Sequence, residues 1–254
     1  MTRVLAISNR KGGVGKSTSV LNIGAALARA GHTVLLVDLD PQANLTQSLG
    51  MEAAPRNING ALLGEYRPTA YPTCAENLVL LAGSPALSAM ERNKGREPGS
   101  EFLLRELLAP FQTRCDFILL DCPPALDLIT LNAYACAQQI FVPLEAQLFG
   151  LQGLELVLEL VARVRQRLNP ELEVGGAFFT RFDKRKILRR ETAQQLRVKY
   201  PGLVMESVVR ESIGLGEAPH LHQDIFTYAA TSAGAADYQA LTAEILARQP
   251  FVSI

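Results

Sequence analysis

A glycine-rich stretch between a short apolar run and a helical pattern constrains this chain more than any other feature. The run Arg3–Ser8 leads into the stretch Asn9-Arg10-Lys11-Gly12-Gly13-Val14-Gly15-Lys16-Ser17-Thr18, and a helical pattern covers about Lys16–Ala30. Glycines let the backbone bend so that successive N–H groups point at one anion, and the helix N-terminus adds its dipole. A lysine followed by a hydroxyl at that point suits the phosphates and the Mg²⁺ of a nucleotide. The stretch therefore predicts a strand, a phosphate-binding loop and a helix, in that order.

The loop departs from the ordinary phosphate-loop pattern G-x-x-x-x-G-K-[ST]. The position of its first glycine holds Arg10, and the sequence reads K-G-G-x-G-K-[ST], with a second lysine at Lys11. At the usual glycine frequency, a chance match to this pattern is on the order of one in ten thousand. The residues expected to contact a nucleotide are Lys11, Gly12, Gly13, Val14, Gly15, Lys16, Ser17 and Thr18.

The rest of the chain alternates between strand-like and helical segments. Strands are expected at Arg3–Ser8, Thr33–Asp38, Leu78–Leu81, Asp116–Asp121, Gln139–Leu144, Val174–Thr180 and Val204–Val209. Helices are expected at about Lys16–Ala30, Glu101–Phe111, Leu128–Ala137, Leu151–Leu168, Ile187–Tyr200 and Ala235–Ala247. This alternation predicts an α/β fold with a doubly wound, mostly parallel sheet and helices on both faces. The irregular stretches Met51–Glu76 and Asn93–Ser100 are too short to divide the chain, which predicts a single domain over residues 1–254.

The composition narrows the class of protein and its partners. Of the 254 residues, 25 are basic and 25 are acidic, and 48% are apolar. That apolar share argues against a largely disordered chain. Zero net charge means that the protein as a whole does not attract nucleic acid electrostatically, although a local basic patch still could. No apolar run approaches the roughly 18 residues of a membrane span, and the apolar run near the N-terminus is too short for a signal-peptide core. These features predict a cytoplasmic protein.

Two segments place carboxylates directly after apolar strands. Asp38-Leu39-Asp40-Pro41-Gln42 follows the second expected strand, and Asp121-Cys122-Pro123-Pro124 follows the strand Asp116–Asp121. Open α/β sheets bind their ligands at the carboxyl ends of their strands, so these acids are expected beside the phosphate loop.

The loop and the two acidic segments together resemble the ParA/MinD family of P-loop ATPases, whose Walker A loop is deviant in this way. The late segments Glu217-Ala218-Pro219 and Ser232-Ala233-Gly234-Ala235 are similar to those of its ParA/Soj-type partition members. The resemblance implies the P-loop NTPase fold, ATP and Mg²⁺ as ligands, and a sandwich homodimer that forms on ATP.

The resemblance also implies roles for individual side chains. Lys11 would reach across the dimer to the partner's phosphates, and Asp40, at the family's switch I position, would orient the attacking water. Asp121 looks like the Walker B acid. The implied catalytic residues are Lys11, Lys16 and Asp40; the implied Mg²⁺ ligands, direct or through water, are Ser17, Asp121 and Asp40; and the adenine would lie near Thr180 and Arg181.

A basic segment indicates which kind of macromolecule such an ATPase could bind on its surface. Residues 181–200 hold eight basic and two acidic residues, an excess of six positive charges in a neutral chain. At helical spacing, one face could carry Lys186, Arg189, Arg190 and Arg197. Such a stripe suits phosphate backbones without base reading, so nonspecific double-stranded DNA is the expected partner. The expected contacts are Lys184, Lys186, Arg189, Arg190 and Arg210, although the segment after Arg210 lacks a second arginine common in the family.

Three interpretations of the function stay open at this stage. The favoured one is a ParA-like ATPase that is cytoplasmic and nucleoid-associated, binds DNA as the ATP dimer, and is reset by a ParB-like or other activating partner. The second is a MinD-like, membrane-associated positioning ATPase. The C-terminal segment Glu244–Ile254 carries one basic residue and a helix-stopping Pro250, which argues against a stable membrane anchor. The third is a nucleotide-switched regulatory module with negligible turnover.

Overall fold

The computed structural model of the protein describes residues 2–147 and 150–248, and it is built on one eight-stranded sheet. The strands in chain order are β1 (Arg3–Ile7), β2 (Val34–Asp38), β3 (Tyr71–Pro72), β4 (Leu78–Leu81), β5 (Phe117–Asp121), β6 (Gln139–Leu144), β7 (Glu173–Phe182) and β8 (Val204–Arg210). Their order across the sheet is β3-β4-β2-β5-β1-β6-β7-β8. All neighbours pair in parallel except the edge strand β3, which runs antiparallel to β4.

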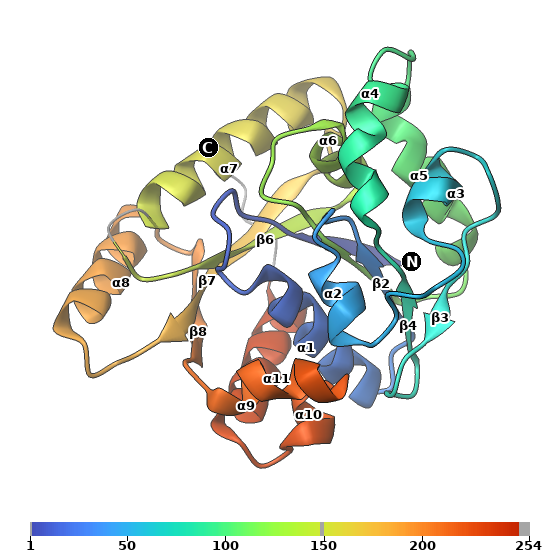
Figure 1. Ribbon diagram of the computed structural model, residues 1–254. Helices are drawn as coiled ribbons and strands as arrows, with labels where there is room; N and C mark the ends of the chain where they lie inside the picture. The colour runs from blue at the N-terminus through green and yellow to red at the C-terminus, as the bar shows by residue number, and fades with distance from the viewer. Residues whose placement is uncertain (1, 148–149, 249–254) are drawn as a thin grey trace.

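Helices cover both faces of this sheet (Figure 1). The α-helices are α1 (Lys16–Arg29), α2 (Asn44–Ser48), α3 (Ile58–Leu62), α4 (Met90–Lys94), α5 (Leu103–Leu108), α6 (Leu128–Cys136), α7 (Gly150–Arg167), α8 (Ile187–Lys199), α9 (Ile213–Glu217), α10 (Ile225–Tyr228) and α11 (Ala233–Ala247). One buried apolar cluster lies between the sheet and α5, α6, α7 and α8, and a second lies between the sheet and α1, α10 and α11. The expected doubly wound, mostly parallel α/β fold is confirmed.

The strands read as nearly continuous apolar sequence because they are buried on both faces. The five residues of β2 and of β5 are all buried, as parallel strands covered by helices on each side should be. Tyr134 on α6 and Tyr238 on α11 are among the largest buried side chains, one on each face. Each tyrosine hydroxyl has a buried hydroxyl partner, Ser8 for Tyr134 and Ser19 for Tyr238, so neither polar group is left unsatisfied.

The expected helix Glu101–Phe111 is the one long element that the structure divides. It consists of a 3₁₀ turn at Ser100–Phe102, the short helix α5, and a second 3₁₀ turn at Ala109–Phe111. Pro110 lacks an N–H group and stops the α-helical hydrogen bonding there. The stretch Met51–Glu76 is mostly irregular, as expected, with α3 and β3 as its short regular pieces.

The strand register brings the ends of three strands into one row. Ile7 at the end of β1 pairs with Asp121 at the end of β5, and Asp121 pairs with Asp38 at the end of β2. The phosphate loop therefore leaves the sheet beside both acidic segments, at its carboxyl edge. No helix within residues 2–147 and 150–248 is long and apolar enough to cross a membrane.

Candidate functional site

The glycine-rich stretch forms a loop that ends directly at the first turn of α1. Gly13 and Gly15 have φ angles of 76° and 79°, in the left-handed region that favours glycine, and Gly15 is the residue preceding the helix. A side chain at Gly13 would meet no atom within 4 Å, so backbone conformation rather than lack of space requires glycine there. The free N–H groups of the first turn of α1 point out of the helix beside this loop, which is an anion-binding arrangement.

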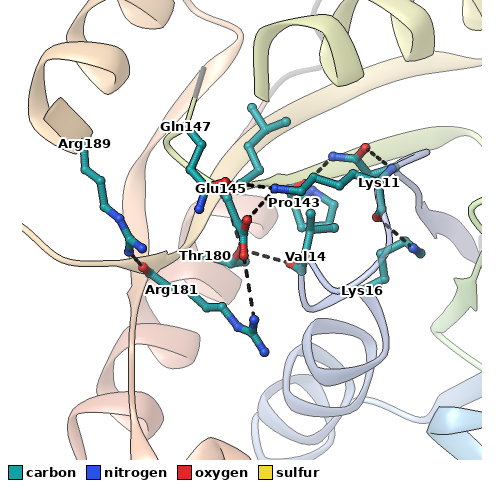
Figure 2. Close-up of polar contacts among 11 residues, drawn as sticks. Lys11, Val14, Lys16, Pro143, Glu145, Gln147, Thr180, Arg181 and Arg189 are labelled. Atoms are coloured by element: carbon teal, nitrogen blue, oxygen red, sulfur yellow. Dashed lines mark hydrogen bonds and ion pairs between the residues drawn. The ribbon is translucent and has the colours of Figure 1, made fainter. Parts of the chain in front are cut away.

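Two hydrogen bonds from buried side chains hold the loop to the neighbouring strands, and a third bond lies within the loop (Figure 2). Asn9 donates from Nδ2 to the carbonyl oxygen of Pro143 at 2.7 Å and accepts the N–H of Lys11 at 2.9 Å. Thr180 on β7 donates from its hydroxyl to the carbonyl oxygen of Val14 at 2.9 Å. The sequence interpretation assigned no role to Asn9, because an asparagine before a glycine-rich loop carries no motif of its own.

The two loop lysines have different surroundings (Figure 2). Lys16 is buried, and its ammonium group lies 3.4 Å from the carbonyl oxygen of Lys11, so it stays within the curve of the loop. The side chain of Lys11 is 38% exposed, and its ammonium group pairs with the carboxylate of Glu145 at 2.6 Å and with Gln147 Oε1 at 3.2 Å. Lys11 therefore has an intrachain partner that the sequence did not reveal.

Asp121 is the most unusual side chain of the site. It is fully buried, and neither of its carboxylate oxygens has a hydrogen-bond partner among the described residues. Burial and the neighbouring Asp38 carboxylate hold the pKa of Asp121 well above its ordinary value, while Ser17 and Lys16 act in the opposite direction. Two buried, unpartnered oxygens beside a hydroxyl group fit a hydrated Mg²⁺ ion.

Asp40, another metal ligand expected from the sequence, and Asp38, which was not expected to bind the metal, lie at the same edge. Asp40 is buried and accepts the N–H of Gln42 at 2.9 Å. Asp38 is buried too, and its burial raises the pKa of its carboxyl group to about 6. Within residues 2–147 and 150–248, no group of three or more His, Cys, Asp and Glu side chains could hold a metal ion. Mg²⁺ typically keeps several waters and takes phosphate oxygens as ligands, so a site of this kind needs few protein groups.

A pocket of about 450 Å³ opens beside the loop, between α1, β7 and the segment that follows β8. Its lining includes Gly15, Thr18, Thr180, Arg181, Glu211, Ser212, Pro219 and Tyr238. The volume lies in the ordinary range for small-molecule sites, and the pocket adjoins the N-terminus of α1. The expected adenine neighbours Thr180 and Arg181 thus line a cavity of suitable size. The contribution of Glu211 and Ser212 was missed because they are distant in sequence and carry no nucleotide motif.

The basic segment forms an exposed surface beyond this pocket. Lys184, Lys186 and Arg190 are exposed and have no ion-pair partner among the described residues. Arg189 is partly buried, and its guanidinium group donates to the carbonyl oxygen of Arg181 (Figure 2). We refer to Lys184, Lys186, Arg189 and Arg190 as the basic surface.

Two arginines of the expected DNA interface have other partners in the structure. The predicted stripe is wrong for Arg197, which turns toward β8, donates to the carbonyl oxygen of Met205 at 3.1 Å and lies over the ring of Phe179. Arg210 forms an ion pair with Asp237 of α11 at 2.6 Å, with further hydrogen bonds from Nε and its backbone N–H. The contact of Arg210 with DNA stays a prediction. To make it, Arg210 must either break the ion pair with Asp237 or bind a DNA phosphate while keeping that pair.

Comparison with known proteins shows which family the chain belongs to. A family model described as an AAA domain matches residues 2–174. The chain is 39% identical over 250 residues to the chromosome-partitioning ATPase Soj of Treponema pallidum, covering 98% of both chains. It is 35% identical over 253 residues to the chromosome partitioning protein ParA of Caulobacter vibrioides, covering 97% of this chain and 95% of that protein.

A similar solved structure is cobyrinic acid a,c-diamide synthase from Mycobacterium smegmatis with bound ADP and magnesium. Its TM-score is 0.85 at 33% identity, covering 97% of this chain and 94% of that one. The fold and the lysine-containing loop define a P-loop ATPase of the deviant Walker A class. The chain belongs to the ParA/MinD family, and the curated relatives above are partition ATPases of the ParA and Soj type.

Proposed function

We propose that this protein is a ParA-like, Mg²⁺-dependent ATPase that dimerises on ATP, binds DNA without sequence preference and is reset by partner-stimulated hydrolysis. The observation that carries the proposal is the fully buried Asp121, unpartnered on both oxygens beside the Lys16 end of the phosphate loop. A fold keeps an unpaired carboxylate in its interior at a cost in stability, and a bound cation would remove that cost. The related structure with ADP and magnesium, at 33% identity, supports the same ligands here.

The proposal assigns a role to the phosphate loop, to Ser17, Asp121 and Asp40, and to the pocket beside them. The backbone N–H groups of Gly13 to Lys16 and the Lys16 ammonium group hold the β- and γ-phosphates. Ser17 and Asp121 hold Mg²⁺, directly or through water, and Mg²⁺ offsets the charge on the phosphate oxygens. Asp40, at the start of the loop after β2, orients the attacking water. The pocket lined by Thr180 and Arg181 takes the nucleoside.

Lys11 supplies the link between nucleotide and dimer. Its ammonium group lies on the outer side of the loop, where it pairs with Glu145 at 2.6 Å. To reach the phosphates of a second subunit, Lys11 must exchange this carboxylate for the more highly charged triphosphate. That exchange makes the dimer dependent on ATP, and the positive charge stabilises the charge that develops during phosphoryl transfer.

The basic surface supplies the DNA contact. A dimer presents two copies of this surface to one duplex, whereas the monomer presents one, so affinity rises on dimerisation. Lysines and arginines on an exposed surface suit contacts to phosphates, and phosphate contacts carry no sequence information. This function places the protein in the cytoplasm, on the nucleoid. The residues Gln249–Ile254, which belong to the segment used to argue against a membrane anchor, lie outside the described residues.

The proposal is tested by measuring ATP hydrolysis together with oligomeric state. Turnover is measured with Mg²⁺, alone and with double-stranded DNA, while light scattering reports the mass with a slowly hydrolysed ATP analogue or with ADP. We expect a dimer with the analogue, a monomer with ADP, and slow turnover that rises when a partner protein is added. A monomer in both nucleotide states, or binding without any turnover, would leave a nucleotide-switched regulator as the better description.

A further inference from the structure

A second feature of the loop edge concerns Asp38, which takes no direct part in the function proposed above. Asp38 ends β2, is fully buried, and uses both carboxylate oxygens. Oδ1 accepts the N–H of Asp40 at 3.2 Å, and Oδ2 accepts both the N–H and the hydroxyl of Thr46, at 2.8 and 2.6 Å. One carboxylate therefore binds both ends of the segment 40–46, which begins with Asp40.

Thr46 also connects Asp38 to the chain just after the end of β4. Its hydroxyl oxygen accepts the N–H of Gly83, which follows β4, at 2.7 Å, and the residue is 1% exposed. A Cβ atom at Gly83 would lie 2.7 Å from Cγ of Asp38, so only glycine lets the chain approach this closely. We call the set Asp38, Thr46 and Gly83 the clasp.

The clasp restricts where the carboxylate of Asp40 can lie. Between its two ends the segment is already tight: Gln42 donates its N–H to Asp40 Oδ1 at 2.9 Å, and Ala43 donates to the Asp40 carbonyl oxygen at 2.8 Å. Ala43 has a φ of 51°, an uncommon conformation for alanine that the surrounding bonds must maintain. With both ends fixed by Asp38, the segment has little freedom to swing away from the sheet edge.

We propose that Thr46 is a positioning residue for ATP hydrolysis, acting through the clasp to hold Asp40 where it can orient the attacking water. This inference rests on the role of Asp40 in the proposed function. Thr46 acts through its neighbours and not on the nucleotide. Its hydroxyl group donates to Asp38 and accepts from Gly83, and valine can do neither. Serine keeps the hydroxyl group and should keep the function.

The test compares Thr46→Val, Thr46→Ser and the control Ser48→Ala, whose exposed hydroxyl only bonds within its own helix α2. Single-turnover hydrolysis, affinity for a slowly hydrolysed ATP analogue and melting temperature are measured for each. Thr46→Val should lower the hydrolysis rate about tenfold or more, as small displacements of positioning groups do, with affinity within about twofold of the parent. Thr46→Ser should stay within about threefold in rate, and Ser48→Ala should match the parent.

Several outcomes would overturn the inference. Thr46→Val that hydrolyses ATP at the parent rate, or a serine variant as slow as the valine variant, removes the hydroxyl group from the mechanism. A valine variant whose affinity falls as much as its rate points to a general loss of the site. If Asp40→Ala itself keeps the parent rate, the proposed role of Asp40 and this inference both fail, whereas a slow Asp40→Ala beside a parent-like Thr46→Val rejects only the inference.

A measurement on the unmodified protein decides the matter if Thr46→Val does not fold. Amide hydrogen exchange is followed with and without the ATP analogue. The N–H groups of Thr46 and Gly83 should exchange as slowly as those of β2 in both states. Fast exchange of these two amides in the ATP-bound protein would mean that the clasp opens when Asp40 is needed, and it would overturn the inference.

Discussion

The phosphate-loop edge and the basic surface at the start of α8 are both rich in polar side chains, but these side chains are held in different ways. At the loop edge, Asn9, Thr180 and Asp38 are buried and bond mainly to backbone groups of the loop or of neighbouring strands. On the basic surface, Lys184, Lys186 and Arg190 are exposed and have no ion-pair partner among the described residues. The first region holds its polar groups in a fixed geometry, as the proposed nucleotide site requires. The second offers charge without fixed partners, as the proposed contact with DNA phosphates requires.

The largest expected effect tests the rigid region. Lys16→Ala removes the buried ammonium group from the curve of the loop, and ATP affinity should fall at least about a hundredfold, because no other cation can occupy that position. Calorimetric titration with Mg-ATP measures the change. Lys94→Ala is the control, since Lys94 pairs with Glu97 on a distant surface. Parent-like affinity in Lys16→Ala would remove this lysine from the site.

The next pair of variants separates dimerisation from hydrolysis at the same edge. Lys11→Ala should bind ATP but stay monomeric, because the exposed lysine acts only across the interface. Asp40→Ala should bind ATP and dimerise yet hydrolyse it slowly, because it loses the group that orients water. Light scattering with ATP, run beside a turnover assay, measures both. If Lys11→Ala dimerises as well as the parent, the cross-subunit role is wrong.

Asp121→Asn should have opposite effects on the stability of the buried region and on its ligand binding. Asparagine has no charge to bury, so the free energy of unfolding of the nucleotide-free protein should rise by roughly 1–3 kcal/mol, while Mg²⁺-dependent ATP binding is lost. Chemical denaturation and calorimetry measure the two effects. A less stable variant that still binds Mg-ATP would contradict the assignment.

The same variant has an expected pH dependence. Burial raises the pKa of Asp121, so the folded protein holds a proton that the unfolded chain has already released. The contribution of Asp121 to stability is therefore favourable below its unfolded pKa and is lost as the pH rises toward the folded pKa. The stability advantage of Asp121→Asn should be smallest near the unfolded pKa, about pH 4, and grow toward neutral pH. A constant difference across that range would argue against the raised pKa.

The smallest effect tests the flexible region. Arg190→Ala should weaken DNA binding about equally on all sequences and lower the salt slope by roughly one for each phosphate that is no longer neutralised, or about two for a dimer. Arg185→Ala is the matched control, because Arg185 is also exposed but its guanidinium group is held by Asp183 at 3.0 Å. If both variants lose the same DNA affinity, an ion pair within the chain does not determine which basic side chains contact DNA.

The sequence predicted the rigid region well for a physical reason. A phosphate loop needs left-handed glycines, a lysine and a hydroxyl at fixed spacing, so the motif and its place between β1 and α1 could be recognised directly. Apolar strands bounded by acids likewise predicted the sheet and the position of Asp121. The supporting contacts of Asn9, Thr46 and Glu145 could not be predicted, because each joins segments that come together only in the folded chain.

The basic surface was harder to predict because the availability of a charge depends on partners elsewhere. Helical spacing predicted that Arg197 lies on the same stripe as Arg189 and Arg190. In the structure, its guanidinium group instead donates a hydrogen bond to a backbone carbonyl group of β8. Asp237, from helix α11, pairs with Arg210. A charge count over a sequence segment cannot register either partner.

DNA binding in the two nucleotide states tests the central claim most directly. Fluorescence anisotropy is measured with two unrelated duplexes of equal length, each over a salt series, with ATP and with ADP. We predict binding with ATP that is nearly the same for both duplexes and falls steeply with salt, and much weaker binding with ADP. Equal, negligible binding in both nucleotide states would contradict the claim and indicate that the ATP dimer acts on a protein or membrane surface instead.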